Sequence, residues 1–323
     1  MSAAVPVLSV LLCTRDHARA LEATLCAFAS VDLPAKDLPV EFIVIDNGST
    51  DNTALVAARC AQDIFESRGI QYRYVYEARP GQCHARNSGL TAARGELILF
   101  TDDDVRPSHN WIVGMSRPLL DGAADAVVGR VTLAPYLERP WMLPIHRSWL
   151  AGTDMLKDGP LRLVGASMGF HKRVLEKVPR FDIELGPGAL GFGDDTLFGQ
   201  QLQVAGYRIA SAFDTVIEHH PDADRLLRRS FLATAAKQGR SSAYVTHHWN
   251  HDKINWARVR AIKAAVRLAA CRVAKGVAPV TRGDEEGISE REMLFAFYVS
   301  FFAHYAIEYR RTRRYEHHGL TVR

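Results

Sequence analysis

The sequence predicts an α/β fold in which a mostly parallel sheet is flanked by helices and followed by a C-terminal helical extension. Three observations lead to this prediction. Apolar runs typical of strands alternate with amphipathic segments over residues 7–121. Several of these runs are nearly continuous, as expected of parallel strands that are buried on both faces. From residue 225 onward, helical periodicity dominates.

The predicted elements follow one another as strand, helix, strand, helix. The expected strands span residues 7–13, 40–45, 70–76, 96–100 and 126–133. The expected helices span residues 16–30, 55–65, 83–94, 195–205, 256–275 and 293–309, with a linker at 279–287. This alternation favours βαβ units. Because parallel strands end at one edge of a sheet, a ligand is expected beyond their carboxyl ends.

Composition places the chain among ordinary globular proteins. Of its 323 residues, 47% are hydrophobic and 24% are charged, which excludes collagen-like, disordered and disulfide-scaffold classes. The formal net charge is +4 and gives no case for a nucleic-acid partner. Residues 1–224 carry 21 basic and 28 acidic side chains (net −7), and residues 225–323 carry 19 and 8 (net +11). The second part is therefore expected to face different surroundings, such as an anionic surface.

The cysteines and the apolar segments predict a cytoplasmic protein. The five cysteines include no C-x-x-C pair and are odd in number, which argues against a zinc ribbon and suits a reducing compartment. Residues 1–6 lack the basic region of a signal peptide. The apolar run at 293–307 is shorter than the ~20 residues that a membrane span needs.

Polar residues follow three of the predicted strands and should converge in one crevice. Thr14 follows the first strand, Asp46 the second, and the three aspartates at 102–104 the fourth. Adjacent carboxylates are costly unless a cation neutralises them. Magnesium and manganese are typically held by one or two carboxylates together with substrate phosphates. The alternative is a solvated acidic turn that caps a helix near Ser108, but the position beside Thr14 and Asp46 favours metal and nucleotide binding.

An ordered set of motifs gives a resemblance to a known family. Thr14-Arg15 ends the first strand, and V-I-D-N-G-S-T-D at 44–51, A-R-N-S-G at 85–89 and F-T-D-D-D at 100–104 follow. V-G-A-S-M-G-F at 164–170 and F-G-D-D-T-L-F at 192–198 come further downstream. Over residues 7–243 this set resembles family 2 glycosyltransferases of the GT-A fold, whose sheet is Rossmann-like. The resemblance implies a GT-A glycosyltransferase domain at residues 1–245 and a basic, aromatic-rich helical extension at residues 246–323.

The resemblance also implies roles for residues of the donor site. A nucleotide-sugar is expected to contact Thr14, Arg15, Asp46, Arg86, Asp102 and Asp103, of which Asp103 has no secure role. A divalent metal, Mn²⁺ or Mg²⁺, is expected on Asp104 and His219, with His220 as a neighbouring alternative. A carboxylate at position 46 can accept the imide N–H of a uracil-like base, so a UDP-sugar is the expected donor. Simpler alternatives leave Asp46 in a turn and Arg86 on a helix surface.

The acidic pair Asp194-Asp195 is expected on the acceptor side. The resemblance implies that Asp195 is the general base for an acceptor hydroxyl and that Asp194 and Ser167 lie near the acceptor. Attack opposite to the leaving nucleoside diphosphate would give inversion. The two acids could instead cap the helix that follows them. Asn47, Gln201, Asp194 and Ser167 depart from the family's usual residues, which we expect to affect the choice of donor or acceptor.

Other functions agree less well with the sequence. G-x-G-x-x-G at 186–191 follows no predicted strand and contains Pro187, so a nicotinamide site is not expected. A metal-dependent phosphohydrolase also uses paired aspartates, but Arg106 stands where such an enzyme has Thr or Val. A non-catalytic nucleotide-sugar-binding protein would be expected to have lost Asp104 or Asp195. The predicted function is therefore an inverting, metal-dependent sugar transfer to a hydroxyl acceptor in surface glycan or exopolysaccharide synthesis.

The C-terminal helices leave two interpretations open. They could pack on the catalytic domain. They could instead lie on an anionic membrane, with their Lys and Arg side chains toward the headgroups and close to a lipid-linked acceptor. The second interpretation predicts a cytoplasmic protein in peripheral contact with the inner face of the membrane.

Overall fold

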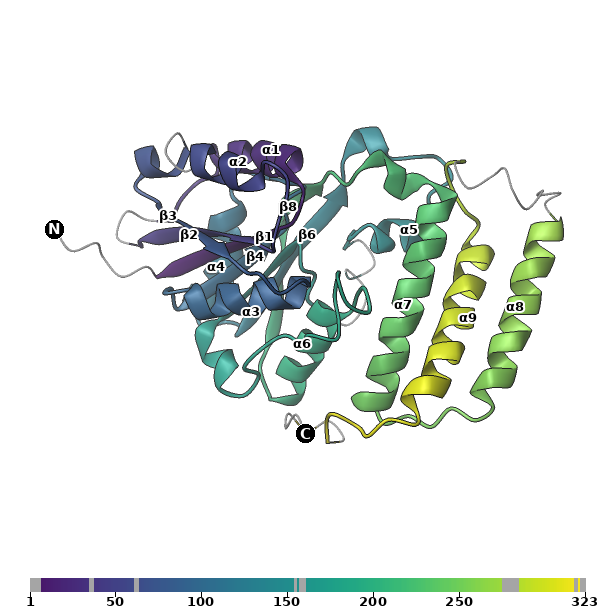
Figure 1. The fold of residues 1–323 in the computed structure, drawn as a ribbon. Helices are drawn as coiled ribbons and strands as arrows, with labels where there is room; N and C mark the ends of the chain where they lie inside the picture. Colours follow the sequence, from purple (N-terminus) through teal and green to yellow (C-terminus); the bar gives the residue numbers. More distant parts are fainter. Residues whose placement is uncertain are drawn as a thin grey trace.

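The computed structural model describes residues 7–34, 38–60, 64–153, 156, 161–274, 285–316 and 319 (Figure 1). Its strands are β1 (Leu8–Thr14), β2 (Val40–Asp46), β3 (Gln71–Tyr76), β4 (Leu97–Thr101), β5 (Val105–Pro107), β6 (Ala126–Leu133), β7 (Ser167–His171) and β8 (Ile209–His219). Its α-helices are α1 (Ala18–Phe28), α2 (Thr53–Cys60), α3 (Gln82–Ala92), α4 (Trp111–Leu120), α5 (Pro144–Trp149), α6 (Asp194–Val204), α7 (Arg228–His248), α8 (Ala257–Ala274) and α9 (Glu290–Glu308).

The described strands form one sheet in the order β3-β2-β1-β4-β7-β6-β8-β5. β3, β2, β1 and β4 are parallel neighbours, and β6 is parallel to β8. β7 runs antiparallel to both β4 and β6, and β5 runs antiparallel to β8. The predicted α/β class with a mostly parallel sheet is confirmed.

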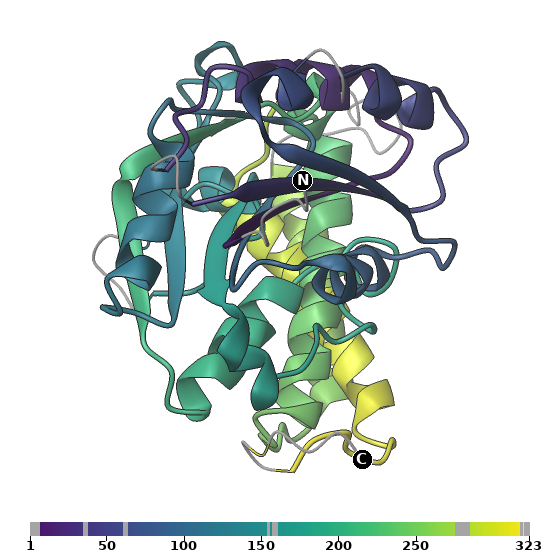
Figure 2. The ribbon, with the colours of Figure 1, turned by 90° about the vertical axis from the view of Figure 1, so that its left-hand side faces the viewer.

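Helices cover both faces of the sheet, which explains the continuous apolar runs of the central strands. Along β1, Val10 and Leu12 pack on one face in the same cluster as Leu25 of α1. Leu11 packs on the opposite face in the same cluster as Leu90 of α3. Figures 1 and 2 show α1 and α2 over one face and α3 and α6 on the other. Each fully buried side chain of this kind contributes roughly 1.5–3 kcal/mol to folding.

The register of the parallel strands brings their carboxyl ends to one edge of the sheet. Thr14 is the partner of Asp46 across β1 and β2. Leu12 is the partner of Thr101 across β1 and β4. The three aspartates at 102–104 directly follow β4, so the polar turns predicted to converge do meet at this edge.

Three strands, β5, β7 and β8, are absent from the sequence prediction. β5 has only three residues, and β7 reads S-M-G-F-H, in which glycine and histidine interrupt the apolar pattern. Gly169 allows β4 and β7 to approach, because a Cβ there would lie 2.4 Å from Leu99 Cδ2. The helix expected at 55–65 begins earlier, at Thr53, and α2 is described as far as Cys60. Residues 1–6, 61–63 and the part of the predicted linker at 279–284 lie outside the described residues.

Three helices form a layer beside the sheet, with α9 between α7 and α8 (Figure 1). α7 and α9 approach closely at Gly239, where a Cβ would lie 2.5 Å from the carbonyl oxygen of Phe297. Among the described helices, none combines the length and the apolar character needed to span a membrane. The predicted boundary between residues 245 and 246 falls within α7, and the division into two domains there stays a prediction.

A set of contacts that we call the polar clamp ties the helical layer to the loop before α6. Asp182 Oδ2 accepts hydrogen bonds from the Tyr244 hydroxyl of α7 at 2.7 Å and from the Tyr315 hydroxyl at 2.6 Å. Glu184 pairs with Arg314 at 2.7 Å. The loop that leads to α6 is therefore held by residues more than 60 positions further along the chain.

Candidate active site

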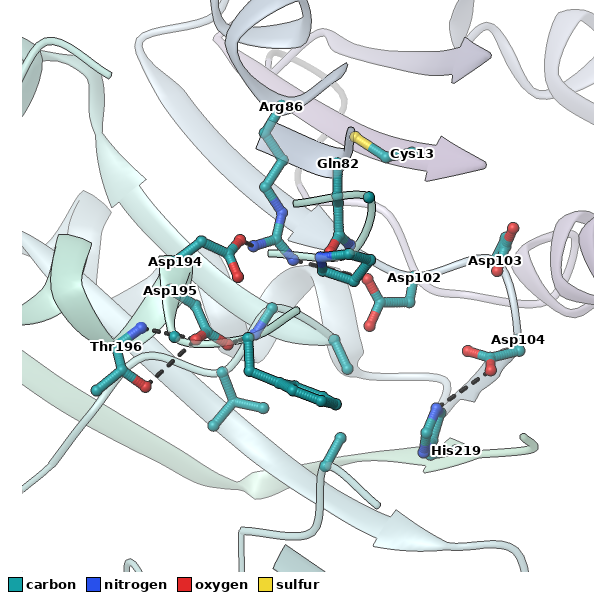
Figure 3. Close-up of a pocket in the computed structure, with 18 of the residues that line it drawn as sticks. Cys13, Gln82, Arg86, Asp102, Asp103, Asp104, Asp194, Asp195, Thr196 and His219 are labelled. Carbon is teal, nitrogen blue, oxygen red and sulfur yellow. Dashed lines mark hydrogen bonds and ion pairs between the residues drawn. The ribbon is translucent and has the colours of Figure 1, made fainter. Parts of the chain in front are cut away.

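A cavity of about 500 Å³ opens at the carboxyl-end edge of the sheet (Figure 3). Its walls come from the turns after β1 and β4, the start of α3, the start of α6 and the end of β8. This size is typical of a small-molecule site. Most of the predicted site residues line it: Thr14, Arg15, Arg86, Asp102, Asp103, Asp104, Asp194, Asp195 and His219.

Ser167 does not lie at the cavity, which corrects its predicted place on the acceptor side. It is fully buried in β7, where its hydroxyl accepts a hydrogen bond from Trp111 Nε1 of α4 at 2.9 Å. Successive side chains of a strand point to opposite faces of the sheet. Ser167 consequently points toward α4, whereas the preceding residue, Ala166, lines the cavity.

Asp46 is buried beside the cavity and does not line it. One carboxylate oxygen accepts the backbone N–H of Ser49 at 2.8 Å, and the other accepts the Tyr74 hydroxyl at 2.5 Å. These bonds build the turn after β2, from which Asn47 reaches the cavity wall. Asp46 is 1% exposed, so in this arrangement its carboxylate is covered from a nucleotide base in the cavity.

Asp104 and His219 form a close pair at one side of the cavity (Figure 3). His219 Nε2 lies 3.2 Å from Asp104 Oδ2. His219 Nδ1 lies 2.8 Å from the carbonyl oxygen of Leu150, which can only accept, so Nδ1 carries a hydrogen. Burial disfavours the charged form of both groups, but each charge favours the other. The pKa of Asp104 is lowered to about 2 and the pKa of His219 is raised.

The donor atoms of this pair suit a hard divalent cation. Asp104 Oδ2 and His219 Nε2 point toward each other, and the Leu150 carbonyl fixes the imidazole, as is common for metal-binding histidines. A cation bound here would take the place of the proton on Nε2. Within the part of the chain that the structure describes, no group of three or more His, Cys, Asp and Glu residues is placed to hold a metal alone. Mg²⁺ and Mn²⁺ commonly complete their shell with water and substrate phosphates. A metal on this pair would therefore depend on a bound phosphate ligand.

Arg86 is a buried cation between two carboxylates of the cavity. Its guanidinium pairs with Asp194, and its Nη2 lies 3.9 Å from Asp102 Oδ1. The guanidinium also lies 5.9 Å and 5.5 Å from the ring centroids of Phe100 and Phe181. Burial raises the pKa of Asp102 to about 7, although the charge of Arg86 opposes the shift. The structure thus gives Asp194 the role of charge partner to Arg86.

Asp195 lies at the N-terminus of α6 and lines the cavity. Its Oδ2 accepts the backbone N–H of Gly165 at 2.8 Å, and its Oδ1 accepts the backbone N–H of Thr196 at 2.6 Å. Burial and the charge of Asp194 raise the pKa of Asp195. Because an ionised carboxylate has about four lone-pair positions, Asp195 keeps the capacity to accept a hydrogen bond from a ligand hydroxyl.

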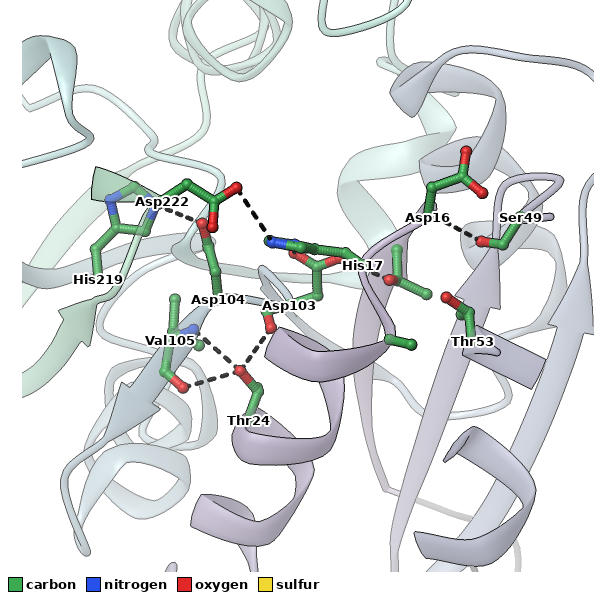
Figure 4. A network of polar contacts seen from close by, with 12 residues as sticks. Asp16, His17, Thr24, Ser49, Thr53, Asp103, Asp104, Val105, His219 and Asp222 are labelled. Atoms are coloured by element: carbon green, nitrogen blue, oxygen red, sulfur yellow. Dashed lines mark hydrogen bonds and ion pairs between the residues drawn. The ribbon is translucent and has the colours of Figure 1, made fainter. Parts of the chain in front are cut away.

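Asp103 is engaged by side chains of β1 and of the turn after it (Figure 4). Its Oδ2 accepts the Thr14 hydroxyl at 2.6 Å, and its Oδ1 lies 3.0 Å from His17 Nδ1. Its carbonyl oxygen accepts the Thr24 hydroxyl of α1 at 2.7 Å. The hydrogen bond to Asp103 raises the pKa of His17 to about 9, against the opposing effect of burial. These contacts fix the turn that carries the neighbouring Asp102 and Asp104.

Replacing His17 with Gln should flatten the dependence of stability on pH. The pKa of His17 is about 9 in the folded chain against 6.5 ordinarily. Its imidazolium therefore stabilises the folded state fully below about pH 6.5, and the stabilisation is lost as the pH rises through about 9. We expect the free energy of unfolding to fall by about 1–3 kcal/mol over this range in the wild type and by less in His17→Gln. Urea unfolding in the presence of a chelator measures both, and parallel pH profiles would contradict the prediction.

Sequence reasoning missed several residues of the cavity wall, including His17, Gln82, Trp149, Arg162 and Arg225. Arg225 lies in the short helix η6 (Ala223–Leu226), and its charge acts on both Asp104 and His219. The sequence could have indicated Arg225, because it is the first Lys or Arg after His219. Trp149 and Arg162 belong to a stretch without periodic pattern, so nothing in the sequence indicates their place at the cavity.

Comparison with known families identifies the class of protein to which this chain belongs. The family model described as glycosyl transferase family 2 matches residues 9–178, more than half of the chain. The chain belongs to this family. The resemblance drawn from the sequence motifs is confirmed, and membership supports a role in glycosyl transfer.

Curated relatives are glycosyltransferases of different lengths. Glycosyltransferase AglE of Haloferax volcanii is 26% identical over 264 residues, which cover 81% of this chain and 80% of AglE. Chondroitin synthase of Pasteurella multocida is 24% identical over 232 residues, which cover 62% of this chain and 23% of the synthase. The chain therefore spans most of the first relative and about a quarter of the second.

Solved structures confirm the GT-A fold. The mannosyltransferase PcManGT from Pyrobaculum calidifontis, in complex with GDP-Man and Mn²⁺, has a TM-score of 0.60 at 18% identity, covering 94% of this chain and 87% of that chain. S. aureus TarS 1–349 in complex with UDP has a TM-score of 0.51 at 14% identity, covering 94% and 90%.

Proposed function

We propose that the protein is an inverting, metal-dependent glycosyltransferase that moves a sugar from a nucleotide-sugar, a UDP-sugar, to a hydroxyl of a glycan or lipid-linked acceptor. One observation carries this proposal. The Asp104–His219 pair and the carboxylate of Asp195 line a single cavity of about 500 Å³, so a metal-bound diphosphate and an acceptor hydroxyl can share one site. Relatives crystallised with GDP-Man or UDP support the class of donor.

On the donor side, Asp104 and His219 would hold Mn²⁺ or Mg²⁺, and Asp102 would accept a ribose hydroxyl. When bound, the cation offsets the charge that develops on the leaving diphosphate. Arg225 is a further cation at this end of the cavity, suited to a phosphate oxygen. Thr14, Arg15 and Asp46 would lie toward the base, with Asp46 exchanging the Tyr74 hydroxyl for the base.

On the acceptor side, Asp195 would act as the general base. The acceptor oxygen attacks the anomeric carbon, a C–O bond forms there, and the bond from that carbon to the diphosphate oxygen breaks. The hydroxyl proton passes to Asp195, and the nucleoside diphosphate leaves from the opposite side, which inverts the anomeric configuration. The hydrogen bonds from Gly165 and Thr196 would orient the carboxylate for this step.

Family membership favours sugar transfer over the phosphohydrolase that the sequence left open. The presence of Asp104 and Asp195 on one cavity favours an enzyme over a non-catalytic nucleotide-sugar-binding protein. We further propose that transfer serves surface glycan or exopolysaccharide synthesis, on the cytoplasmic side and at the inner face of a membrane. The net positive charge of residues 225–323 supports this location.

A thermal-shift screen of nucleoside diphosphates and their sugars, with and without Mn²⁺, tests the proposal. A ligand at about 100 times its Kd stabilises the folded chain by roughly 2.7 kcal/mol. We expect UDP with Mn²⁺ to stabilise the wild type, and Asp104→Ala to lose the part of the shift that needs Mn²⁺. Asp121→Ala, which removes an exposed carboxylate at the C-terminal end of α4 and outside the cavity wall, is the matched control. Failure of every nucleotide to stabilise the wild type, or an unchanged Mn²⁺ response in Asp104→Ala, would refute the proposed donor site.

A further inference from the structure

The outer face of α8 carries an apolar stripe that nothing described in the chain covers. α8 packs against α9 on one side and is the outermost helix of the layer (Figure 1). Val259, Ile262 and Val266 are 43%, 65% and 63% exposed. At about 3.6 residues per turn, these three side chains share one face of the helix. That face is opposite the buried Ala257 and Ala264, which lie on the packed side.

Cations border this stripe on both sides. Helical spacing places Arg258 on one side of the stripe and Lys263 on the other, and both side chains are exposed. Arg260 and Arg267 lie toward α9, where their guanidinium groups are 5.8 Å and 6.0 Å from aromatic ring centroids. The sequence of α8 contains five Lys and Arg and no Asp or Glu. Just before the helix, Trp256 is 79% exposed.

We propose that this face of α8, which we call the α8 outer face (Trp256, Arg258, Val259, Ile262, Lys263 and Val266), docks on the surface of an anionic phospholipid bilayer. The helix would lie in the plane of the interface, with its apolar stripe below the headgroups and its cations among the phosphates. The tryptophan suits the same depth, because an indole has an apolar body and one N–H donor.

Charge distinguishes the bilayer from other occupants. A second copy of the chain docked face to face would bring the cations of two α8 helices together without an acid between them, which is unfavourable. A nucleic acid would satisfy the cations but would leave the apolar stripe exposed. An anionic bilayer satisfies both the stripe and the cations at once. The cavity is lined by residues up to Gln238 of α7 and by none of α8, so the docking surface is separate from the catalytic site.

Vesicle flotation of the full chain, without donor or metal, tests the proposal independently of sugar transfer. We expect flotation with vesicles of phosphatidylglycerol and phosphatidylcholine in about equal parts, none with phosphatidylcholine alone, and weaker binding at high salt. Ile262→Asp with Val266→Asp should weaken binding by roughly tenfold or more. Arg258→Gln with Lys263→Gln should weaken it by roughly 25-fold, about fivefold for each cation.

Matched variants elsewhere on the surface serve as controls. Leu55→Asp alters a 69% exposed side chain of α2, and Arg19→Gln with Arg117→Gln removes two exposed cations from α1 and α4. Both should float like the wild type. A second readout is a blue shift of tryptophan fluorescence on adding anionic vesicles, which Trp256→Phe should diminish.

Three results would overturn the proposal. The first is that the wild type does not float with anionic vesicles. The second is that the control variants lose as much vesicle binding as the α8 variants. The third is that light scattering shows a dimer, which Ile262→Asp with Val266→Asp converts to a monomer. The last result would assign the α8 outer face to a second copy of the chain. Because every substituted side chain is exposed, we expect the thermal unfolding of the α8 variants to be unchanged. Unchanged unfolding excludes misfolding as the cause of a loss of vesicle binding.

Discussion

Asp195→Asn should lower the rate of sugar transfer about a thousandfold while leaving nucleotide binding unchanged. An amide cannot take the proton of an acceptor hydroxyl, and general base catalysis typically contributes 10²- to 10⁴-fold, so the estimate is about 10³-fold. The N–H groups of Gly165 and Thr196 bond to different oxygens of the Asp195 carboxylate, so the single amide oxygen of the variant can keep one of these two hydrogen bonds. Release of nucleoside diphosphate in the presence of acceptor measures the rate, and the thermal shift with nucleotide measures binding.

The pH profile gives a second readout for Asp195. Burial and the charge of Asp194 raise the pKa of Asp195, so the base is protonated over a wider acidic range than a free aspartate. We expect the transfer rate to fall with decreasing pH along a limb that Asp195→Asn lacks. Asp121→Asn, on an exposed aspartate of the α4 end, should behave like the wild type. Full transfer activity in Asp195→Asn would mean that another residue is the base.

Asp194→Ala should lower the free energy of unfolding by about 3–5 kcal/mol. Asp194 is the direct ion-pair partner of the buried Arg86. Asp102 is further away, with its Oδ1 3.9 Å from Arg86 Nη2. Removing one member of a buried pair leaves the other charge uncompensated in a region of low dielectric constant, which is more costly than losing the pair. Urea unfolding of the variant and the wild type measures the change.

A double variant separates this structural role from a role in binding the acceptor. Arg86→Met with Asp194→Leu replaces both charges by apolar groups, and such replacements of buried pairs are often neutral in stability. We expect the double variant to be more stable than Asp194→Ala and to be inactive in sugar transfer, because Asp102 loses its nearest cation. If Asp194→Ala kept wild-type stability and lost only activity, Asp194 would belong to the acceptor site.

The fold was predictable from sequence where burial alone determines the pattern. β1, β2 and β4 are covered on both faces, so their apolar runs identify them without knowledge of the tertiary structure. β7 was not predictable, because its identity depends on pairing with β4, in which Ser167 faces Thr101. The same pairing determines which face each β7 residue occupies. A shift of one residue decides whether Ser167 or Ala166 faces the cavity.

The site was predictable in its residue types and less so in its contacts. The aspartates at 102–104 were identified because they follow a predicted strand, and those at 194–195 because they stand where the resembled family has an acidic pair. Their partners are distant in sequence: Arg86 and Asp194 are 108 positions apart, and Thr14 and Asp103 are 89 apart. Propensity and periodicity carry no information on such pairs. The engagement of Asp46 by Tyr74 was missed for the same reason.

The polar clamp limits which segments of this protein can be replaced by those of a relative in a chimera. Its carboxylate at Asp182 belongs to the loop that leads to Asp195, whereas the hydroxyls of Tyr244 and Tyr315 flank the α8–α9 helical pair in sequence. A chimera that combined this sheet with a helical layer lacking hydroxyls at these two places would leave the Asp182 carboxylate without both donors. The three residues must therefore be inherited together, so recombination at the edge of the helical layer perturbs the loop that positions the proposed base.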